Sequence, residues 1–274
     1  MKIGNREFDT ENECYIMGIL NVTPDSFSDG GKFNNIDSAL SHAEAMISEG
    51  VDIIDVGGES TRPGFTRISD DEEISRIVPV IEALKERFDV PVSIDTYKYK
   101  VASAAAEAGA DLFNDIYGLK YDNGEMAAFI AKSGLPCCLM HNRNNMDYVC
   151  FMDDLINDMR ETVDIAKKAG ITDDSIILDP GVGFAKSLEN NLEAIDRLDM
   201  LKNELGYPVL LGTSRKSVIG LTLDLPSDQR VEGTIATTVI GVMRGAAFVR
   251  VHDVKENLRA VKMTQAIMRG YKRG

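Results

Sequence analysis

Eight short apolar runs alternate with eight longer stretches of helical period, and together they predict an α/β fold, a (β/α)8 barrel in a single domain. The runs are short, continuous and mainly apolar, as in parallel strands that helices cover on both faces. The chain has 274 residues, near the ~250 that such a barrel usually needs. An open, doubly wound sheet is the alternative arrangement of the same elements.

The predicted elements alternate along the whole chain. Candidate strands lie at residues 15–20, 52–56, 92–94, 111–115, 136–140, 175–179, 209–211 and 247–251. Candidate helices lie near residues 37–49, 72–87, 98–108, 123–133, 151–169, 188–205, 230–244 and 255–271. The first helix places Leu40, Ala43 and Ile47 on one face, which is the spacing of a half-buried helix. Residues 1–14 are predicted to form a short hairpin that plugs the bottom of the barrel.

Composition and charge limit the classes of function. The chain carries 44 acidic and 30 basic residues, its formal net charge is −14, and its pI is about 4.7. Such acidity argues against nucleic-acid partners and against binding to anionic membranes. No apolar stretch reaches the ~18 residues of a membrane span. The four cysteines form no CxxC pair and the N-terminus shows no signal pattern, so we expect a reduced, cytoplasmic setting.

Polar residues stand at the end of almost every predicted strand. In a parallel barrel these ends meet at one face, where active sites collect. The residues concerned are Asn21, Asp95, Asn114, Asp115, His141, Asp179, Lys216, Ser217, Arg250 and His252. Each alone has a simpler explanation: Asp95 could cap a helix, and Lys216 could form a solvated charge pair with Arg215. Their shared position favours a binding site.

The first two predicted strands lead into long loops rich in glycine, serine, threonine and proline. These loops read NVTPDSFSDGG (21–31) and GGESTRPG (57–64). Loops of this kind offer backbone N–H groups and mobility, which suit a lid over an anion. Surface loops without a function are the alternative. Motifs of other classes are missing, because the chain has no GxGxxG after a strand, no GxxxxGK[ST], no HExxH and no GxSxG.

Eight segments resemble the dihydropteroate synthase family, a family of pterin-binding TIM barrels. They are MGILNVTPDSFSDGG (17–31), DVGGESTRPG (55–64), SIDTYKYKVA (93–102), FNDIYGL (113–119), CLMH (138–141), LDPGVGF (178–184), LLGTSRKSVIG (210–220) and FVRVHDV (248–254). They follow the family's order and span nearly the whole chain. The first two and the SRKS segment are the most specific.

The resemblance implies a transferase of folate biosynthesis. Such an enzyme condenses 6-hydroxymethyl-7,8-dihydropterin pyrophosphate with p-aminobenzoate to give 7,8-dihydropteroate and pyrophosphate, assisted by Mg²⁺. The resemblance also implies competition by sulfonamides and a homodimer formed through the late helices. Two alternatives share the barrel: a pterin-binding methyltransferase acting on methyltetrahydrofolate, and a non-catalytic pterin-binding homologue. The SRKS segment and the Arg250–His252 pair favour the synthase.

The resemblance assigns roles to single positions. The pterin binders are Asp95, Asn114 and Asp179, with Lys216 between the pterin and the second substrate. The pyrophosphate end is held by Asn21, Arg250 and His252, with Asn21 as the Mg²⁺ ligand. The p-aminobenzoate site is lined by Phe184 and Ser217 and closed by loop residues Phe27, Asp29, Thr61, Arg62 and Pro63. The residues expected to be catalytic are Lys216, Asp95, Arg250 and Asp179.

The chemistry expected of these residues is an SN1-like alkyl transfer. Pyrophosphate leaves once its charge is held, and positive charge develops on the pterin methylene. The carboxylates of Asp95 and Asp179 would favour that charge in a site poor in water. The amine of p-aminobenzoate then attacks, so no protein nucleophile is required.

Two segments depart from the family pattern. Ala185 stands where the family usually has glycine, and one methyl group is tolerated there unless the backbone needs a positive φ. Residues 142–145 read NRNN where the family often shows methionine and glycine. We therefore expect the fifth loop to be longer or differently shaped.

Overall fold

Eight parallel strands close into a barrel in the computed structural model, which describes residues 1–23, 32–60 and 67–270. The strands are β3 (Tyr15–Asn21), β4 (Ile53–Gly57), β5 (Val92–Asp95), β6 (Leu112–Asp115), β7 (Cys137–Met140), β8 (Ile176–Asp179), β9 (Leu210–Leu211) and β10 (Phe248–Val251). Their order in the sheet is β8-β7-β6-β5-β4-β3-β10-β9. A single parallel bridge between Leu178 and Val209 joins β8 to the strand beside it and closes the ring.

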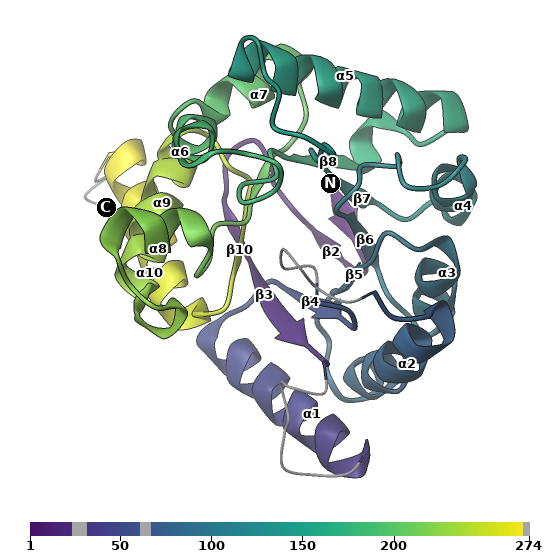
Figure 1. Ribbon diagram of the computed structural model, residues 1–274. Helices are drawn as coiled ribbons and strands as arrows, with labels where there is room; N and C mark the ends of the chain where they lie inside the picture. The colour runs from purple at the N-terminus through teal and green to yellow at the C-terminus, as the bar shows by residue number, and fades with distance from the viewer. Residues whose placement is uncertain (24–31, 61–66, 271–274) are drawn as a thin grey trace.

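Helices surround this barrel on its outer side (Figure 1). They are α1 (Lys32–Glu49), α2 (Asp70–Arg87), α3 (Tyr99–Glu107), α4 (Glu125–Ser133), α5 (Phe151–Ala169), α6 (Leu188–Asp196), α7 (Leu198–Leu205), α8 (Ser217–Leu223), α9 (Val231–Met243) and α10 (Val254–Arg269). Short 3-10 turns at Asp173–Ser175 and Ser227–Gln229 complete the described elements. The predicted (β/α)8 barrel is confirmed, and the closing bridge excludes the open sheet.

The helices differ from the prediction at two places. The single helix expected at 188–205 is broken at Arg197, which caps the end of α6 and the start of α7. Ile195 at the end of α6 and Leu198 at the start of α7 are both buried, so the core continues across the break. The sequence analysis also missed α8, whose seven residues are too few and too uniformly apolar to show a helical period.

A small hairpin lies under the barrel. β1 (Lys2–Ile3) and β2 (Arg6–Glu7) pair in antiparallel fashion. Ile3 and Phe8 are buried in a cluster with residues from the barrel interior, which include Met17 and Phe248. The ring centroid of Phe8 lies 4.8 Å from that of Tyr15 and 5.8 Å from that of Phe248. The hairpin therefore fills the amino-terminal end of the barrel with apolar side chains and leaves the opposite end to the polar groups.

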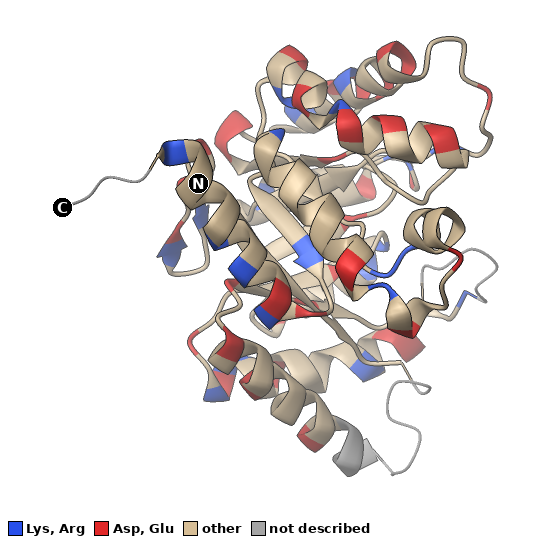
Figure 2. Ribbon diagram, turned by 90° about the vertical axis from the view of Figure 1, so that its left-hand side faces the viewer, with Lys and Arg blue, Asp and Glu red and all other residues tan. Residues whose placement is uncertain are grey.

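Acidic and basic residues are scattered over the outer helices (Figure 2). In the part of the chain that the structure describes, no helix is both long enough and apolar enough to cross a membrane.

We expect Phe8→Ala to lower the free energy of unfolding by about 3 kcal/mol, because the substitution leaves a cavity under the barrel where Phe8 is 4% exposed. Urea unfolding followed by circular dichroism measures the change. Val149→Ala is the control, because Val149 is fully exposed and its truncation should change stability by less than ~0.5 kcal/mol. Equal effects of the two substitutions would contradict a packed plug.

Candidate active site

The neighbouring strands β3 to β6 bring three polar residues and one glycine into one layer at the carboxyl end of the barrel. In the parallel register Asn21 pairs with Gly57, Gly57 with Asp95, and Asp95 with Asn114. Asp179 ends β8 in the same way, opposite Met140 of β7. Because the register is unbroken from β3 to β6, the predicted pterin binders and Asn21 share one face of the barrel.

A half-buried guanidinium group links three strands at this end of the barrel. Arg250 Nε donates to Asp55 Oδ2 at 2.6 Å, and Arg250 Nη2 donates to Asp95 Oδ2 at 2.7 Å. Asn114 Nδ2 also donates to Asp55 Oδ2, at 3.2 Å. Burial disfavours the charged form of Arg250, but Asp55 and Asp95 outweigh it and raise the Arg250 pKa above its usual value. Arg250 is therefore a fixed positive charge at the centre of the site.

Three buried oxygens, one in this layer and two in the layer beneath it, lack a hydrogen-bond partner among the described residues. They are Asp55 Oδ1, Asp95 Oδ1 and Ser93 Oγ. A buried polar atom is normally hydrogen-bonded, so an orphaned carboxylate oxygen indicates that a donor is supplied from outside the chain. The burial of Asp95 raises its pKa to about 7, because the charged form is poorly solvated there. A ligand with N–H groups would satisfy these atoms and favour the ionised carboxylate.

Lys216 and Asp179 face each other across Gly212. A Cβ atom at Gly212 would lie 3.7 Å from Asp179 Oδ2 and 3.7 Å from Lys216 Nζ, so the glycine keeps the space between the two charges open. Lys216 Nζ donates to the Val182 carbonyl at 2.6 Å and lies 4.9 Å from the centroid of the Phe184 ring. Burial lowers the Lys216 pKa to about 8 and raises that of Asp179.

An apolar wall flanks the charged layer. Tyr97, Ile116 and Met140 form a small buried cluster, and Phe184 packs against it. A flat ring that bonds to the carboxylates through its edge could therefore rest its faces on apolar side chains.

The remaining predicted residues lie at the rim or outside the described residues. His252 follows β10, and its Nδ1 lies 3.0 Å from Ser214 Oγ, which also accepts the His252 backbone N–H. Ser217 is exposed at the start of α8, and Asn21 is half-buried at the end of β3. The predicted lid residues Phe27, Asp29, Thr61, Arg62 and Pro63 lie outside the described residues. Arg215 pairs with Asp253, through contacts of 3.1 and 2.5 Å, whereas Lys216 points to the Val182 carbonyl.

The sequence analysis missed several charged residues near the site. Asp55 lies within a buried strand and forms an ion pair with Arg250. The sequence marks it only as one charged residue in an apolar run. Lys98 Nζ lies 2.8 Å from Glu59 Oε2 and 2.7 Å from Glu73 Oε2, which joins the end of β4 to α2. Lys186 is buried behind Asp179. A charge within an apolar run could have pointed to Asp55, whereas Lys98 and Lys186 stand in mixed segments that carry no such signal.

The loop after β8 contains a strained alanine. Ala185 has a φ of +46°, so its backbone lies in the left-handed region that the family's glycine adopts freely. The exception named in the sequence analysis therefore applies: the backbone needs a positive φ at this position, so the extra methyl group is held there at a cost in backbone strain. The Ala185 carbonyl accepts a hydrogen bond from the Tyr148 hydroxyl at 3.0 Å. Since Tyr148 belongs to the unusual fifth loop, the two departures from the family pattern contact each other.

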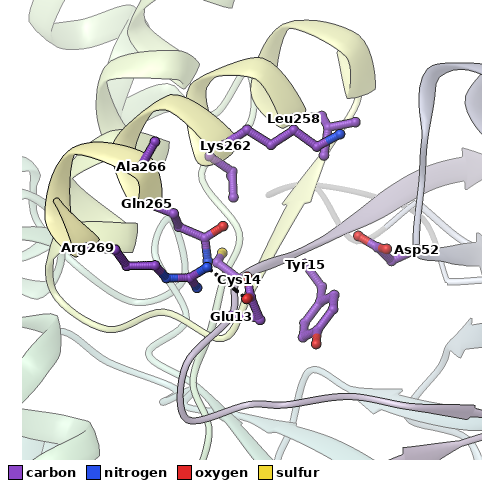
Figure 3. Close-up of a pocket in the computed structure, with 10 residues that line it drawn as sticks. Glu13, Cys14, Tyr15, Asp52, Leu258, Lys262, Gln265, Ala266 and Arg269 are labelled. Atoms are coloured by element: carbon purple, nitrogen blue, oxygen red, sulfur yellow. Dashed lines mark ion pairs between the residues drawn. The ribbon is translucent and has the colours of Figure 1, made fainter. Parts of the chain in front are cut away.

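A separate cavity lies at the opposite end of the barrel (Figure 3). Its volume is about 360 Å³, and it opens between α10 and the amino-terminal ends of β3 and β4. The lining includes Cys14, Tyr15, Asp52 and Lys262, with an ion pair between Arg269 and Glu13. The carboxyl ends of the strands point away from it, so it is not the site built by the predicted residues.

Comparisons with known proteins agree with this geometry. Residues 17–252 match the family model described as "Pterin binding enzyme". The dihydropteroate synthase of Clostridium beijerinckii is 63% identical over 98% of this chain and 100% of its own length. That of Bacillus subtilis is 52% identical over 94% of this chain and 90% of its own length.

Solved structures give the same result. A Clostridium difficile dihydropteroate synthase determined with pteroic acid is 51% identical and superposes with a TM-score of 0.93, covering 96% of this chain and 100% of that chain. A Xanthomonas albilineans dihydropteroate synthase with 4-aminobenzoic acid is 39% identical, with a TM-score of 0.90 and 95% coverage of both chains. A Yersinia pestis enzyme was solved with a sulfonamide drug, at 43% identity, a TM-score of 0.90 and 98% coverage of both chains.

The fold and the layer of carboxylates thus define a pterin-binding barrel enzyme. The chain belongs to the pterin-binding enzyme family and, within that family, to the dihydropteroate synthases. The family predicted from the eight segments is confirmed.

We expect Ala185→Gly to raise the free energy of unfolding by about 0.5–1 kcal/mol, because glycine relieves the left-handed strain and keeps the Ala185 carbonyl in place. Chemical denaturation with an unchanged m-value measures it. The matched control is Ala128→Gly in the exposed face of α4, where glycine should lower stability by about 1 kcal/mol. A loss of stability at both positions would show that Ala185 is not strained.

Proposed function

We propose that this layer of residues condenses 6-hydroxymethyl-7,8-dihydropterin pyrophosphate with p-aminobenzoate, giving 7,8-dihydropteroate and pyrophosphate. The observation that carries the proposal is the set of orphaned buried oxygens beside a fixed arginine, because a pterin edge offers the missing N–H donors. The relatives named dihydropteroate synthase, and their structures with pteroic acid and 4-aminobenzoic acid, support the substrates.

The pterin ring is bound by three polar side chains and an apolar wall. Asp95 and Asp179 accept from ring and amino N–H groups, and Asn114 can both donate and accept. Ile116 and Met140 contact the ring faces from the cluster behind the layer. Burial strengthens these hydrogen bonds, because the site is poor in competing water.

The second substrate lies on the side of Lys216. The ammonium group sits above the Phe184 ring, and Ser217 follows at the start of α8. Lys216 thus stands between the carboxylates that hold the pterin and an aromatic platform for p-aminobenzoate.

The pyrophosphate end is formed by Arg250, His252 and Asn21. The donor chemistry fits a Mg²⁺ ion that comes with the substrate: Asn21 offers one carboxamide oxygen, and the described residues hold no group of three or more His, Cys, Asp or Glu side chains able to bind a metal. Mg²⁺ commonly takes one or two protein oxygens and completes its shell with phosphate oxygens and water. Once bound, it neutralises part of the pyrophosphate charge.

The reaction proceeds by loss of the leaving group before attack. The C–O bond breaks, its electron pair leaves with the pyrophosphate, and positive charge remains on the pterin methylene. Asp95 and Asp179 stabilise that charge, and Arg250 stabilises the departing anion. The amine nitrogen of p-aminobenzoate then forms the new C–N bond and releases one proton. The bonding electrons are never held by the protein, so no covalent enzyme intermediate forms.

The assembly we propose is a homodimer. The outer faces of α8, α9 and α10 carry exposed apolar residues, namely Leu221, Met243, Met263, Ile267 and Met268, each at least 55% exposed. Neighbouring exposed apolar residues of this kind are typical of a protein interface. All four cysteines are free thiols, which supports the proposed cytoplasmic setting.

Release of pyrophosphate tests the function directly. Purified protein with the pterin pyrophosphate and Mg²⁺ should release pyrophosphate and form dihydropteroate only when p-aminobenzoate is added, and a sulfonamide should compete with that amine. Methyl transfer from methyltetrahydrofolate, or binding of the pterin without turnover, would support the methyltransferase or the non-catalytic homologue.

We expect Lys216→Ala and Arg250→Ala each to reduce kcat/KM by at least ~100-fold, because each removes a half-buried positive charge that acts on the reacting groups. Steady-state kinetics with both substrates give the values. Arg244→Ala removes an exposed arginine paired with Asp196 and should leave the rate within twofold. A near-normal rate in either site variant would refute the assignment.

The pH profile of kcat/KM for the pterin pyrophosphate should be bell-shaped. The rate should rise toward pH 7, because Asp95 must lose its proton to accept a pterin N–H. The rate should fall above pH of about 8, because the Lys216 ammonium loses its charge there. In Lys216→Arg the falling limb should move beyond pH 9, since arginine stays charged. A flat profile between pH 6 and 9 would exclude these two groups.

A further inference from the structure

Lys186 is a buried ammonium group that the mechanism above does not use. Its residue is 8% exposed, and Nζ donates to the carbonyl oxygens of Gly181 and Phe184, at 3.0 Å each. A third contact joins Nζ to His141 Nδ1 at 2.9 Å. The loop of residues 180–187, here called the β8–α6 loop, is thus wrapped around one positive charge.

His141 is fixed as an acceptor for Lys186. Its Nε2 lies 2.9 Å from Asp158 Oδ2, and Arg143 Nε donates to the same oxygen at 2.5 Å. Burial lowers the His141 pKa to about 4, so the ring is neutral at ordinary pH. A neutral ring that donates from Nε2 to Asp158 must present its Nδ1 lone pair to Lys186. The carboxylate on α5 therefore orients the imidazole that holds the lysine.

The β8–α6 loop carries two groups of the proposed site. The Val182 carbonyl accepts from Lys216 Nζ, and the Phe184 ring lies under the same ammonium group. Val182 lies between the two residues whose carbonyl groups bind Lys186, and Phe184 is one of those two residues. Glycine is required at the start of the loop, since a Cβ at Gly181 would lie 2.0 Å from the His141 carbonyl oxygen. The position of the Lys216 ammonium group thus depends on the β8–α6 loop, and Lys186 fixes the conformation of that loop.

Burial of the Lys186 ammonium group has a desolvation cost. Burial lowers its pKa to about 7, although Asp179 and Asp158 favour the charged form. A purely structural position would be filled more stably by an apolar side chain of similar length. A charge kept in such surroundings is typical of a functional requirement.

We propose that Lys186 is a positioning residue for the second substrate: with His141 and Asp158 it sets the β8–α6 loop so that Val182 and Phe184 place Lys216 against p-aminobenzoate. This role rests on the proposed function. Lys186 itself touches neither substrate, and it acts through the two carbonyl groups that it binds.

The experiment compares Lys186→Met with Lys120→Met. Lys120 is the matched control, because it donates to the Asp158 carbonyl and to Glu161 on the same helix but lies on the outer surface. We expect Lys186→Met to raise the KM for p-aminobenzoate at least tenfold, with a smaller change in the KM for the pterin pyrophosphate. Its Tm should stay within a few degrees of wild type or rise. Lys120→Met should leave both KM values within twofold.

A double-mutant cycle tests the contact between His141 and Lys186. His141→Asn keeps an acceptor near Nδ1 and should retain most of the activity, whereas His141→Leu should resemble Lys186→Met. The Lys186→Met/His141→Leu variant should be little worse than either single variant, because both remove one unit. A lower Tm with unchanged KM values, or additive effects, would overturn the positioning role. Failure of the wild-type protein to release pyrophosphate would instead overturn the proposed function.

Discussion

The parallel register of β3 to β6 is the constraint on which the site depends. Because Asn21, Gly57, Asp95 and Asn114 are paired one to the next across four strands, their side chains are placed by backbone hydrogen bonds and not by flexible loops. A shift of one residue in any of these pairs would turn the carboxylate of Asp95 or one of the two carboxamides out of line with the others. The glycine in this row leaves the gap that a ligand ring can enter.

The charges inside the barrel are organised separately from those on its surface. The chain as a whole has a net charge of −14, yet the site places Arg250 between Asp55 and Asp95, and Lys216 opposite Asp179. Such buried pairs contribute little net stability, because desolvation offsets most of the attraction. These pairs instead orient the charged groups. They leave carboxylate oxygens free to accept from a cationic or N–H-bearing ring, and they fix the guanidinium group beside a departing anion. An acidic protein can therefore bind an anionic substrate through a few local cations.

The sequence predicts the barrel well because its strands are continuous apolar runs, which the period of the flanking helices sets apart. It also predicts that Asp95, Asn114 and Asp179 share one face, since strand ends meet in any parallel barrel. The partnership of Asp55 with Arg250 joins residues 195 positions apart, and no local pattern encodes it. The break at Arg197 and the left-handed backbone of Ala185 arise from packing in three dimensions. Local sequence propensity predicts neither the helix break nor the left-handed backbone.

The closure of the barrel has a consequence for how the molecule opens. β9 has two residues, and a single bridge between Leu178 and Val209 joins its side of the ring to β8, whereas other neighbouring strands share up to five register pairs. This seam has the weakest ladder, so transient separation of strands is easiest there, and its amides should exchange with solvent hydrogen sooner than those of β3 and β4. Asp179 and Lys216 stand on opposite sides of the seam. Separation of the strands at this seam would therefore also widen the gap between these two charges.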